Sequence, residues 1–304
     1  MTTPEKFYFD EAHYVPAARQ MLEPVLPSPL LNPMHPPLAK ELMAVSIRVF
    51  GDVPLGWRYP SVLFGSLAIV AMCLCGLALV TAQGPAVASA LIAFFNQMVF
   101  VQSRIAMLDI SALAFGLLAI AAFISGFQKR RPHVWFALAG LAFGPSIARK
   151  WSGLFALAIC VVIVAVVRCG RSGLCSTSSA TVGSRPSSSS AIRWCRGRRC
   201  RRSGFACATG SWRAARRVLD PGPYLAWAML PRTLGFIYYY LPSATTASLA
   251  LAYALRRGNS PRWPLWAFVA TAFAGFAAML PISAAFVGTS METFNRLMIF
   301  QNWI

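Results

Sequence analysis

Long stretches without a charged residue alternate with short polar and basic segments along most of the chain. Three of the longest are Ile110–Gln128, Thr233–Leu255 and Trp263–Val287. A helix needs roughly 20 apolar residues to cross a hydrocarbon core about 30 Å thick, and none of the three alternates in polarity as the strand of a β-barrel does. Because lipid tolerates only helices and closed barrels, this pattern predicts an all-α, polytopic membrane helix bundle.

The same pattern predicts about seven apolar helices and four regions. The expected helices cover residues 60–82, 86–103, 105–127, 133–148, 151–167, 233–255 and 263–287. The expected regions are an external, proline-rich loop at 1–59, an N-terminal membrane bundle at 60–167, an Arg/Ser/Cys-rich irregular segment at 168–222, and a C-terminal membrane region at 223–304.

The composition supports a membrane protein and excludes several other classes. Hydrophobic residues make up 57% of the chain and charged residues only 12%, about half the charged fraction of a soluble domain. A soluble enzyme, a secreted disulfide scaffold and a disordered tail are therefore excluded. The net charge of +19 is unevenly distributed, because residues 168–217 hold 12 of the 28 Lys and Arg residues and no acid. A nucleic-acid partner is not expected, since no aromatic platform or folded module accompanies these arginines.

The Arg/Ser/Cys-rich segment is unlike the rest of the chain. We interpret it as a membrane segment read in a shifted frame, because Leu, Val and Ala codons of GC-rich DNA become Cys, Ser and Arg codons in another frame. The alternative is a disordered basic cytoplasmic loop, which the composition also permits. Its five cysteines form no C-x-x-C pair and have no histidine nearby, so no metal site is expected there.

The basic loops predict how the helices cross the membrane. Lys and Arg concentrate in cytoplasmic loops, which places Lys129–Arg131 and Arg256–Arg262 in the cytoplasm. Residues 1–59 and Arg104 then lie outside. Lys150 also falls outside, where the positive-inside rule disfavours a cation. The same count requires one additional membrane crossing between residues 168 and 238.

Carboxylates and cations gather at the predicted external end of the bundle. The candidate catalytic residues are Asp10 and Glu11, and the candidates for binding the donor phosphate or substrate are His35, Lys40, Arg58, Arg104, Asp109 and Lys150. A carboxylate base and several cations suit transfer from a lipid-linked phosphate, because the acceptor hydroxyl must lose a proton while the leaving anion needs positive charge. Structural roles are the alternative: Asp10 or Glu11 would cap a helix, and Arg104 would pair with Asp109 or anchor the helix end.

Five motifs in order carry a resemblance to a known family: FDEAHYVPAAR, NPMHPPLAKEL, FGDVPLGWRYPS, FVQSRIAMLDI and ARKWSGLFAL. They resemble the bacterial protein O-mannosyltransferases of glycosyltransferase family 39, which have a GT-C membrane fold. Near the C-terminus, PYLAWAMLPRTLGFIYYYLPS and FQNWI resemble the last membrane region of that family. The resemblance covers about residues 8–167 and 223–304.

The resemblance implies transfer of mannose from polyprenyl-phosphate mannose to Ser or Thr of secreted proteins, with inversion, at the external face of the plasma membrane. It places the Asp-Glu motif of the family on Asp10 and Glu11, with Asp10 as the base. The basic residues of the family fall on Arg58, Arg104 and Lys150, and one of the two arginines is expected at the donor phosphate. The implied partners are the lipid-linked donor, the secreted acceptor, membrane lipids and the secretion translocon; no cofactor, metal or nucleic acid is implied.

The resemblance also implies missing parts. Family members have a membrane helix before the Asp-Glu loop and a longer middle where this chain has 168–222, so an inactive membrane remnant is one alternative. A second is another GT-C enzyme that glycosylates a lipid. A third is a transporter, although the internal repeat typical of transporters is not visible in the sequence.

Overall fold

The computed structural model describes part of the chain, and every regular element in that part is a helix. The described residues are 7–23, 31–80, 82–154, 156–158, 160–161, 241–255 and 261–283. No strand occurs among them, so the predicted all-α fold is confirmed. The chain divides into two units, one of residues 1–156 with 231–304 and the other of residues 157–230. The description below concerns the first unit.

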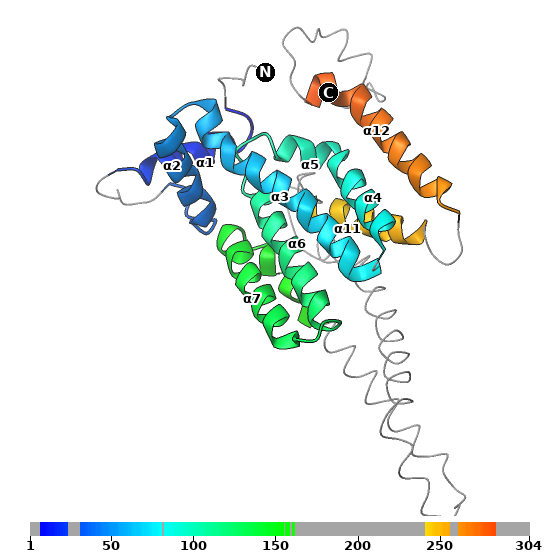
Figure 1. Cartoon of the computed structure of the whole chain (residues 1–304). Helices are drawn as coiled ribbons and strands as arrows, with labels where there is room; N and C mark the ends of the chain where they lie inside the picture. Colours follow the sequence, from blue (N-terminus) through cyan, green and yellow to red (C-terminus); the bar gives the residue numbers. More distant parts are fainter. Residues whose placement is uncertain are drawn as a thin grey trace, which may run out of the picture. The chain divides into compact units, whose positions relative to one another are not determined.

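The helices of this unit carry the labels of Figure 1. They are α1 (Glu11–Gln20), α2 (Leu38–Phe50), α3 (Pro54–Val80), α4 (Gln83–Phe94), α5 (Gln97–Gln102), α6 (Asp109–Gly126), α7 (Pro132–Arg149), α11 (Leu241–Ala254) and α12 (Trp263–Ser283).

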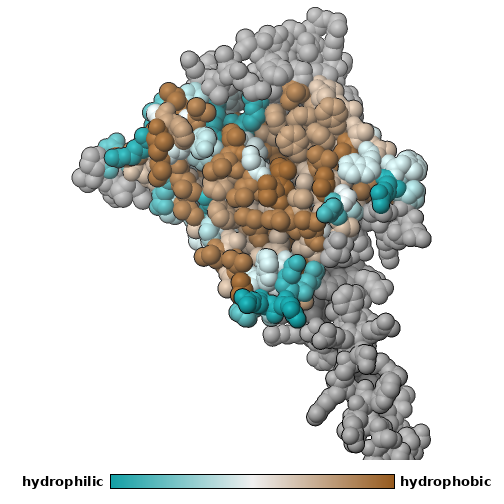
Figure 2. Space-filling view, in the orientation of Figure 1, coloured by the Kyte–Doolittle hydropathy of each residue, from teal (hydrophilic) through white to brown (hydrophobic). Residues whose placement is uncertain are grey.

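Three helices within the described part are long and apolar enough to cross a membrane: Pro54–Leu79, Asp109–Gly126 and Trp263–Leu280. Helix α4 is apolar but shorter. The face shown in Figure 2 is largely hydrophobic, as expected for a surface that meets lipid. These features agree with a polytopic membrane protein, while the predicted number of about seven helices stays a prediction.

The central part of the unit consists of α3, α6 and α7, with α4 packed on α3. Helices α3 and α6 run parallel, since Cys75 Sγ donates to the Leu117 carbonyl and Gln128 Nε2 to that of Ala78, and α7 returns antiparallel to both. Its core joins Ala68, Met72 and Cys75 of α3 to Ile110 and Leu117 of α6. Small side chains such as Ala and Cys let membrane helices approach closely. Helices α11 and α12 pack against α4.

The N-terminal helices form a second apolar cluster beside the start of α3. Tyr14 of α1 and Met43 of α2 pack with Trp57 of α3 and with Leu108, which directly precedes α6. This cluster holds the residues before α1, the first turns of α3 and the start of α6 in one place. The region 1–59, which we expected to be an external loop, therefore contains α1, α2 and the beginning of α3; its position outside the membrane stays a prediction.

Two predicted helix boundaries are wrong. The expected helix 86–103 is two helices, because the Asn96 side chain caps α5 by accepting hydrogen bonds from the backbone amides of Met98 (3.0 Å) and Val99 (3.3 Å). Asparagine is a favoured N-cap, and its effect outweighs the apolar periodicity here. The expected helix 105–127 begins only at Asp109, since Ala106 donates its backbone amide to a distant carboxylate.

Several predictions fall outside the described residues. The expected helix 151–167 is described only at 151–154, 156–158 and 160–161. The segment 168–222, the additional crossing before residue 238 and the closing FQNWI are not among the described residues.

The packing of α3 on α4 depends on Gly76. A Cβ atom at this position would lie 2.7 Å from the Ala86 Cα atom, too close for the helices to keep their separation. Gly76→Ala should therefore lower the thermal stability of the detergent-solubilised chain, by about 1–3 kcal/mol in the free energy of unfolding. Gly140→Ala in α7 is the control, because a Cβ there meets nothing within 4 Å and alanine favours a helix by up to about 1 kcal/mol. Equal melting temperatures for Gly76→Ala and Gly140→Ala would contradict this packing.

Candidate functional site

The predicted site residues meet at the end of the bundle where α3 and α6 begin and α7 ends. Glu11 pairs with Arg58, and Asp109 pairs with Lys150. The remaining four residues, Asp10, His35, Lys40 and Arg104, are linked to these pairs through hydrogen bonds or electrostatic interactions. Positions far apart in sequence come together here because α3 and α6 both begin at this end and α7, which runs antiparallel to them, ends there.

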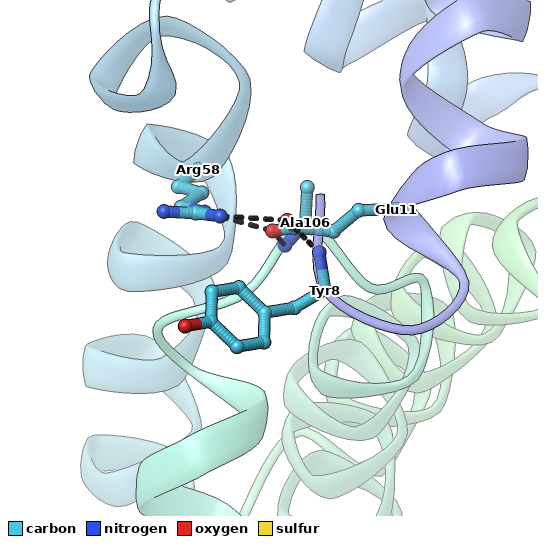
Figure 3. A network of polar contacts seen from close by, with 4 residues as sticks. All are labelled: Tyr8, Glu11, Arg58 and Ala106. Carbon is cyan, nitrogen blue, oxygen red and sulfur yellow. Dashed lines mark hydrogen bonds and ion pairs between the residues drawn. The ribbon is translucent and has the colours of Figure 1, made fainter. Parts of the chain in front are cut away.

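The centre of this end is a buried ion pair between Glu11 and Arg58 (Figure 3). Arg58 donates from Nε to Glu11 Oε1 (2.8 Å) and from Nη2 to Oε2 (2.7 Å). Two backbone amides also donate hydrogen bonds to the Glu11 carboxylate: Tyr8 donates to Oε2 (2.8 Å) and Ala106 to Oε1 (2.7 Å). Glu11 is 0% exposed and Arg58 4%. We call these four hydrogen bonds the Glu11 clamp.

The Glu11 clamp joins three segments of the chain. Glu11 opens α1, Arg58 lies in the first turns of α3, and Ala106 lies in the turn before α6. Each carboxylate oxygen accepts one charged and one backbone hydrogen bond, an arrangement that offsets the cost of burying the charge. This geometry makes Glu11 a structural residue in this conformation.

Asp10 has a different environment from Glu11. It occupies the N-cap position of α1, yet its side chain makes no capping hydrogen bond. It is half-buried, whereas Glu11 is fully buried. The structural role of the Asp-Glu motif thus lies in the Glu11 ion pair, and the Asp10 side chain makes no capping hydrogen bond.

The second ion pair joins the start of α6 to the residue after α7. Lys150 Nζ lies 2.6 Å from Asp109 Oδ1, and both side chains are buried. Asp109 thus pairs with Lys150, whereas the sequence suggested Arg104 as its partner. The other oxygen of Asp109, Oδ2, is buried and has no hydrogen-bond partner within the described part of the chain.

The two neighbouring cations that the positive-inside rule disfavours at this end are both buried. Lys150 is neutralised by Asp109. The Arg149 guanidinium lies over the rings of Phe64 and Phe115, at 3.9 and 4.9 Å from their centroids, which are favourable cation–π distances. Neither is an exposed loop charge, so their position does not oppose the predicted orientation.

His35 lies on a turn that Lys40 and Trp151 hold in place. Lys40 Nζ donates to the carbonyl oxygens of Asn32 (2.7 Å) and His35 (3.1 Å). Trp151 Nε1 donates to the carbonyl of Met34 (3.2 Å). Asn32 adopts a left-handed conformation with φ of 50°, which asparagine tolerates better than most residues. Lys40 is therefore a positioning residue for this turn.

The His35 imidazole lies within electrostatic reach of two carboxylates, those of Asp10 and Asp109. Burial lowers its pKa most, and Lys150 and Lys40 lower it further, while Asp109 and Asp10 raise it. The net pKa is below the ordinary value of 6.5. Nδ1 is buried and has no partner among the described residues. His35 therefore lies within the electrostatic influence of Asp10 and of the Asp109–Lys150 pair.

Arg104 is the half-buried cation of the site. It lies in the turn after α5, and its guanidinium is 5.4 Å from the centroid of the Phe100 ring. Burial and the nearby Arg58 both lower the pKa of Arg104. The side chain also borders a cavity of about 190 Å³, whose walls are mainly apolar residues of α3 and α5. Arg104 therefore places a positive charge where an apolar cavity meets the polar end of the bundle.

Some contributors to the site carry no sequence signal. The amides of Tyr8 and Ala106 complete the Glu11 clamp, and any residue except proline supplies such a donor. Trp151 belongs to the ARKWSGLFAL motif, but its hydrogen bond to a distant turn depends on tertiary packing. No group of three or more His, Cys, Asp or Glu residues that could hold a metal occurs in the described segments.

Removing one charge of the Glu11 clamp should destabilise the protein strongly. Glu11→Gln leaves the Arg58 guanidinium buried without a counter-charge, which typically costs about 3–5 kcal/mol. Thermal unfolding of the solubilised chain, followed by circular dichroism, measures the loss. Glu41→Gln is the control, since Glu41 is exposed. The double variant Glu11→Leu/Arg58→Met should lose less stability than the sum of its single variants, because neither charge is left alone; additive losses would contradict the clamp.

The lowered pKa of His35 predicts a pH-dependent stability. Between the folded and unfolded pKa values, the unfolded chain binds more protons, so stability falls as the pH falls below about 6.5. His35→Gln should reduce the decrease in melting temperature between pH 7.5 and pH 5. His13→Gln, at an exposed position, should leave that decrease unchanged. The same decrease in His35→Gln as in the unsubstituted chain would show that His35 is not responsible.

The comparisons with known proteins point to one family. Residues 54–178 match the family model described as dolichyl-phosphate-mannose-protein mannosyltransferase. The chain is 31% identical over 181 residues to the polyprenol-phosphate-mannose–protein mannosyltransferase of Corynebacterium glutamicum, covering 49% of this chain and 35% of that relative. It is 27% identical over 172 residues to the enzyme of the same name from Mycolicibacterium smegmatis, covering 48% of this chain and 33% of the relative.

A third such relative, from Mycobacterium tuberculosis, is 31% identical over 153 residues, which cover 47% of this chain and 29% of the relative. No solved structure is significantly similar to the chain. The chain thus spans about a third of the length of the curated relatives it matches. The resemblance to protein mannosyltransferases that the ordered motifs predict is confirmed, by a family match that runs from α3 past α7 and by relatives that align with about half of the chain.

Proposed function

We propose that this chain carries the catalytic end of a protein O-mannosyltransferase, which transfers mannose from polyprenyl-phosphate mannose to Ser or Thr hydroxyls. The observation that carries the proposal is the Glu11 clamp, because it joins three of the resembling motifs into one site: FDEAHY, GWRYPS and FVQSRIAMLDI. The printed names of the curated relatives support both the donor and the protein acceptor.

Asp10 is the base in this proposal. It directly precedes the clamped Glu11, it is half-buried, and its side chain does not cap α1. Asp10 accepts the proton of the acceptor hydroxyl as the hydroxyl oxygen forms a bond to the anomeric carbon of mannose. The bond from that carbon to the phosphate oxygen breaks on the opposite face, so the configuration inverts and polyprenyl phosphate leaves. A positioned base typically contributes about 10²–10⁴ in rate.

Arg104 contacts the departing phosphate in this proposal. Its guanidinium is half-buried beside an apolar cavity, and a second guanidinium lies nearby at Arg58. The charge of Arg58 is balanced by Glu11, whereas positive charge at Arg104 stabilises the negative charge that develops on the leaving group. Lys40 and Lys150 act as positioning residues, since each already binds a carbonyl or carboxylate oxygen.

The buried atoms without partners suit the sugar. His35 Nδ1 and Asp109 Oδ2 are polar, buried and unsatisfied within the described part, and such atoms cost free energy unless a ligand or water meets them. Mannose hydroxyl groups both donate and accept hydrogen bonds. We therefore assign His35 and Asp109 to the sugar of the donor.

The site faces the outside of the plasma membrane in this proposal, where secreted proteins emerge from the translocon. The Lys129–Arg131 loop joins α6 to α7 at the opposite end of these helices from Asp109 and Lys150. Because basic loops stay in the cytoplasm, the end with Asp10 and Arg104 is then external.

Asp10→Asn should reduce mannosyl transfer at least about 100-fold, because the amide cannot accept the proton. The assay uses membranes that contain the full chain, polyprenyl-phosphate mannose and a Ser/Thr peptide, with radiolabelled mannose counted on the peptide. Asp52→Asn is the control: Asp52 is an exposed acid that pairs with Arg19, and its loss should leave transfer unchanged.

Three outcomes would contradict this function. Near-normal transfer by Asp10→Asn removes Asp10 as the base. Mannose found on a lipid rather than on the peptide indicates the alternative lipid glycosyltransferase. Absence of transfer by the unsubstituted chain, with donor and peptide present, indicates the inactive membrane remnant.

A further inference from the structure

A second cavity lies away from the proposed active site, near the other ends of α3, α6 and α7. Its volume is about 740 Å³, within the range of roughly 300–1,000 Å³ that is usual for ligand pockets. Its walls are almost entirely apolar and come from all three helices, with Leu77 of α3, Leu118 of α6 and Leu141 of α7 as examples. Leu141 is 73% exposed and Leu77 38%, so the cavity opens to the surface of the bundle.

A basic loop borders one end of this cavity. Lys129 and Gln128 are part of its lining, and Arg130 and Arg131 follow in the same loop and are exposed. Gln128 Nε2 donates to the carbonyl of Ala78 (2.7 Å), which ties the loop to the end of α3 and holds Lys129 at the cavity.

No ion pair of these cations occurs in the described part of the chain. In the sequence from residue 53 to residue 161, the single acidic residue is Asp109, which starts α6 at the opposite end and is paired with Lys150. The cavity therefore combines apolar walls with a net positive rim. This combination is complementary to an amphiphile that carries negative charge next to a hydrocarbon chain.

We propose that this cavity binds an anionic phospholipid of the bilayer. An acyl chain lies along the leucine-lined walls, and the headgroup phosphate lies at Lys129, with Arg130 and Arg131 adding to the attraction. The predicted orientation agrees, because the loop is cytoplasmic and juxtamembrane cations bind anionic headgroups. The proposed donor phosphate belongs to Arg104 at the other end of α3 and α6, so this inference does not depend on the proposed function.

The test measures binding of phosphatidylglycerol to the full chain in phosphatidylcholine nanodiscs. The probe is phosphatidylglycerol with a photoreactive diazirine on one acyl chain, and mass spectrometry of the peptides reports where it reacts. The measured quantity is the labelling that excess phosphatidylglycerol displaces and excess phosphatidylcholine does not. We expect this labelling on peptides of α3, α6 and α7 that line the cavity.

Three variants separate the cavity from general electrostatic attraction. Lys129→Gln should weaken displaceable labelling about fivefold, the contribution typical of one cation at an anionic surface. Arg262→Gln is the matched control, since Arg262 is an exposed cation in the other predicted cytoplasmic loop, and it should have no effect. Leu77→Trp places a larger side chain in the cavity and keeps all charges, so it should weaken the displaceable labelling; a cooperative thermal unfolding transition like that of the unsubstituted chain shows that the variant folds.

Several results would overturn the proposal. Equal displacement by phosphatidylcholine would show an apolar contact without headgroup recognition. An effect of Arg262→Gln as large as that of Lys129→Gln would show non-specific attraction. Unchanged labelling in Leu77→Trp, or crosslinks that show a second copy of the chain in the cavity, would assign it a different occupant.

Discussion

The buried ion pair between Glu11 and Arg58 determines how the polar end of this protein is organised. Either charge alone would be costly in an apolar environment, and the pair is tolerated because the bidentate geometry and two backbone amides use both oxygens of the carboxylate. The start of α1, the start of α3 and the turn before α6 are consequently held together. Asp10 precedes Glu11 directly, and Arg104 is two residues before Ala106, so both proposed catalytic groups are positioned by their neighbours.

The polar residues of this end fall into two groups by burial. Glu11, Lys40 and Lys150 are buried, and their charged groups form ion pairs or hydrogen bonds within the protein. Asp10, His35 and Arg104 are half-buried. The first group stabilises the arrangement, and the second group, together with the Oδ2 atom of buried Asp109, is where we propose that substrate meets the protein. A cluster of charged residues thus combines a structural framework with a smaller set suited to chemistry.

The charges of the bundle also separate into two kinds of end, because α3 and α6 run parallel and α7 returns between the same two ends. One end has carboxylates with cations, buried in pairs or packed on aromatic rings. The other end has an exposed basic loop beside an apolar cavity, without acids. Counting membrane crossings along the sequence places Lys150 and Arg149 at the external end, where the positive-inside rule disfavours cations. Their burial resolves this conflict, because the rule concerns cations in loops and these two side chains lie in the folded interior.

Apolar length and the order of motifs were sufficient to predict the all-α membrane fold, the family resemblance and the set of residues at the polar end, because hydrophobic periodicity and residue type are local properties. The sequence did not determine the partner of each residue. The pairing of Asp109 with Lys150 and the hydrogen bonds of Lys40 to a turn depend on which segments lie side by side. The distinction between Glu11 and Asp10 is the clearest case. Adjacent carboxylates look equivalent in sequence, and only the tertiary structure, by bringing Arg58 and two backbone amides to one of them, makes that one structural.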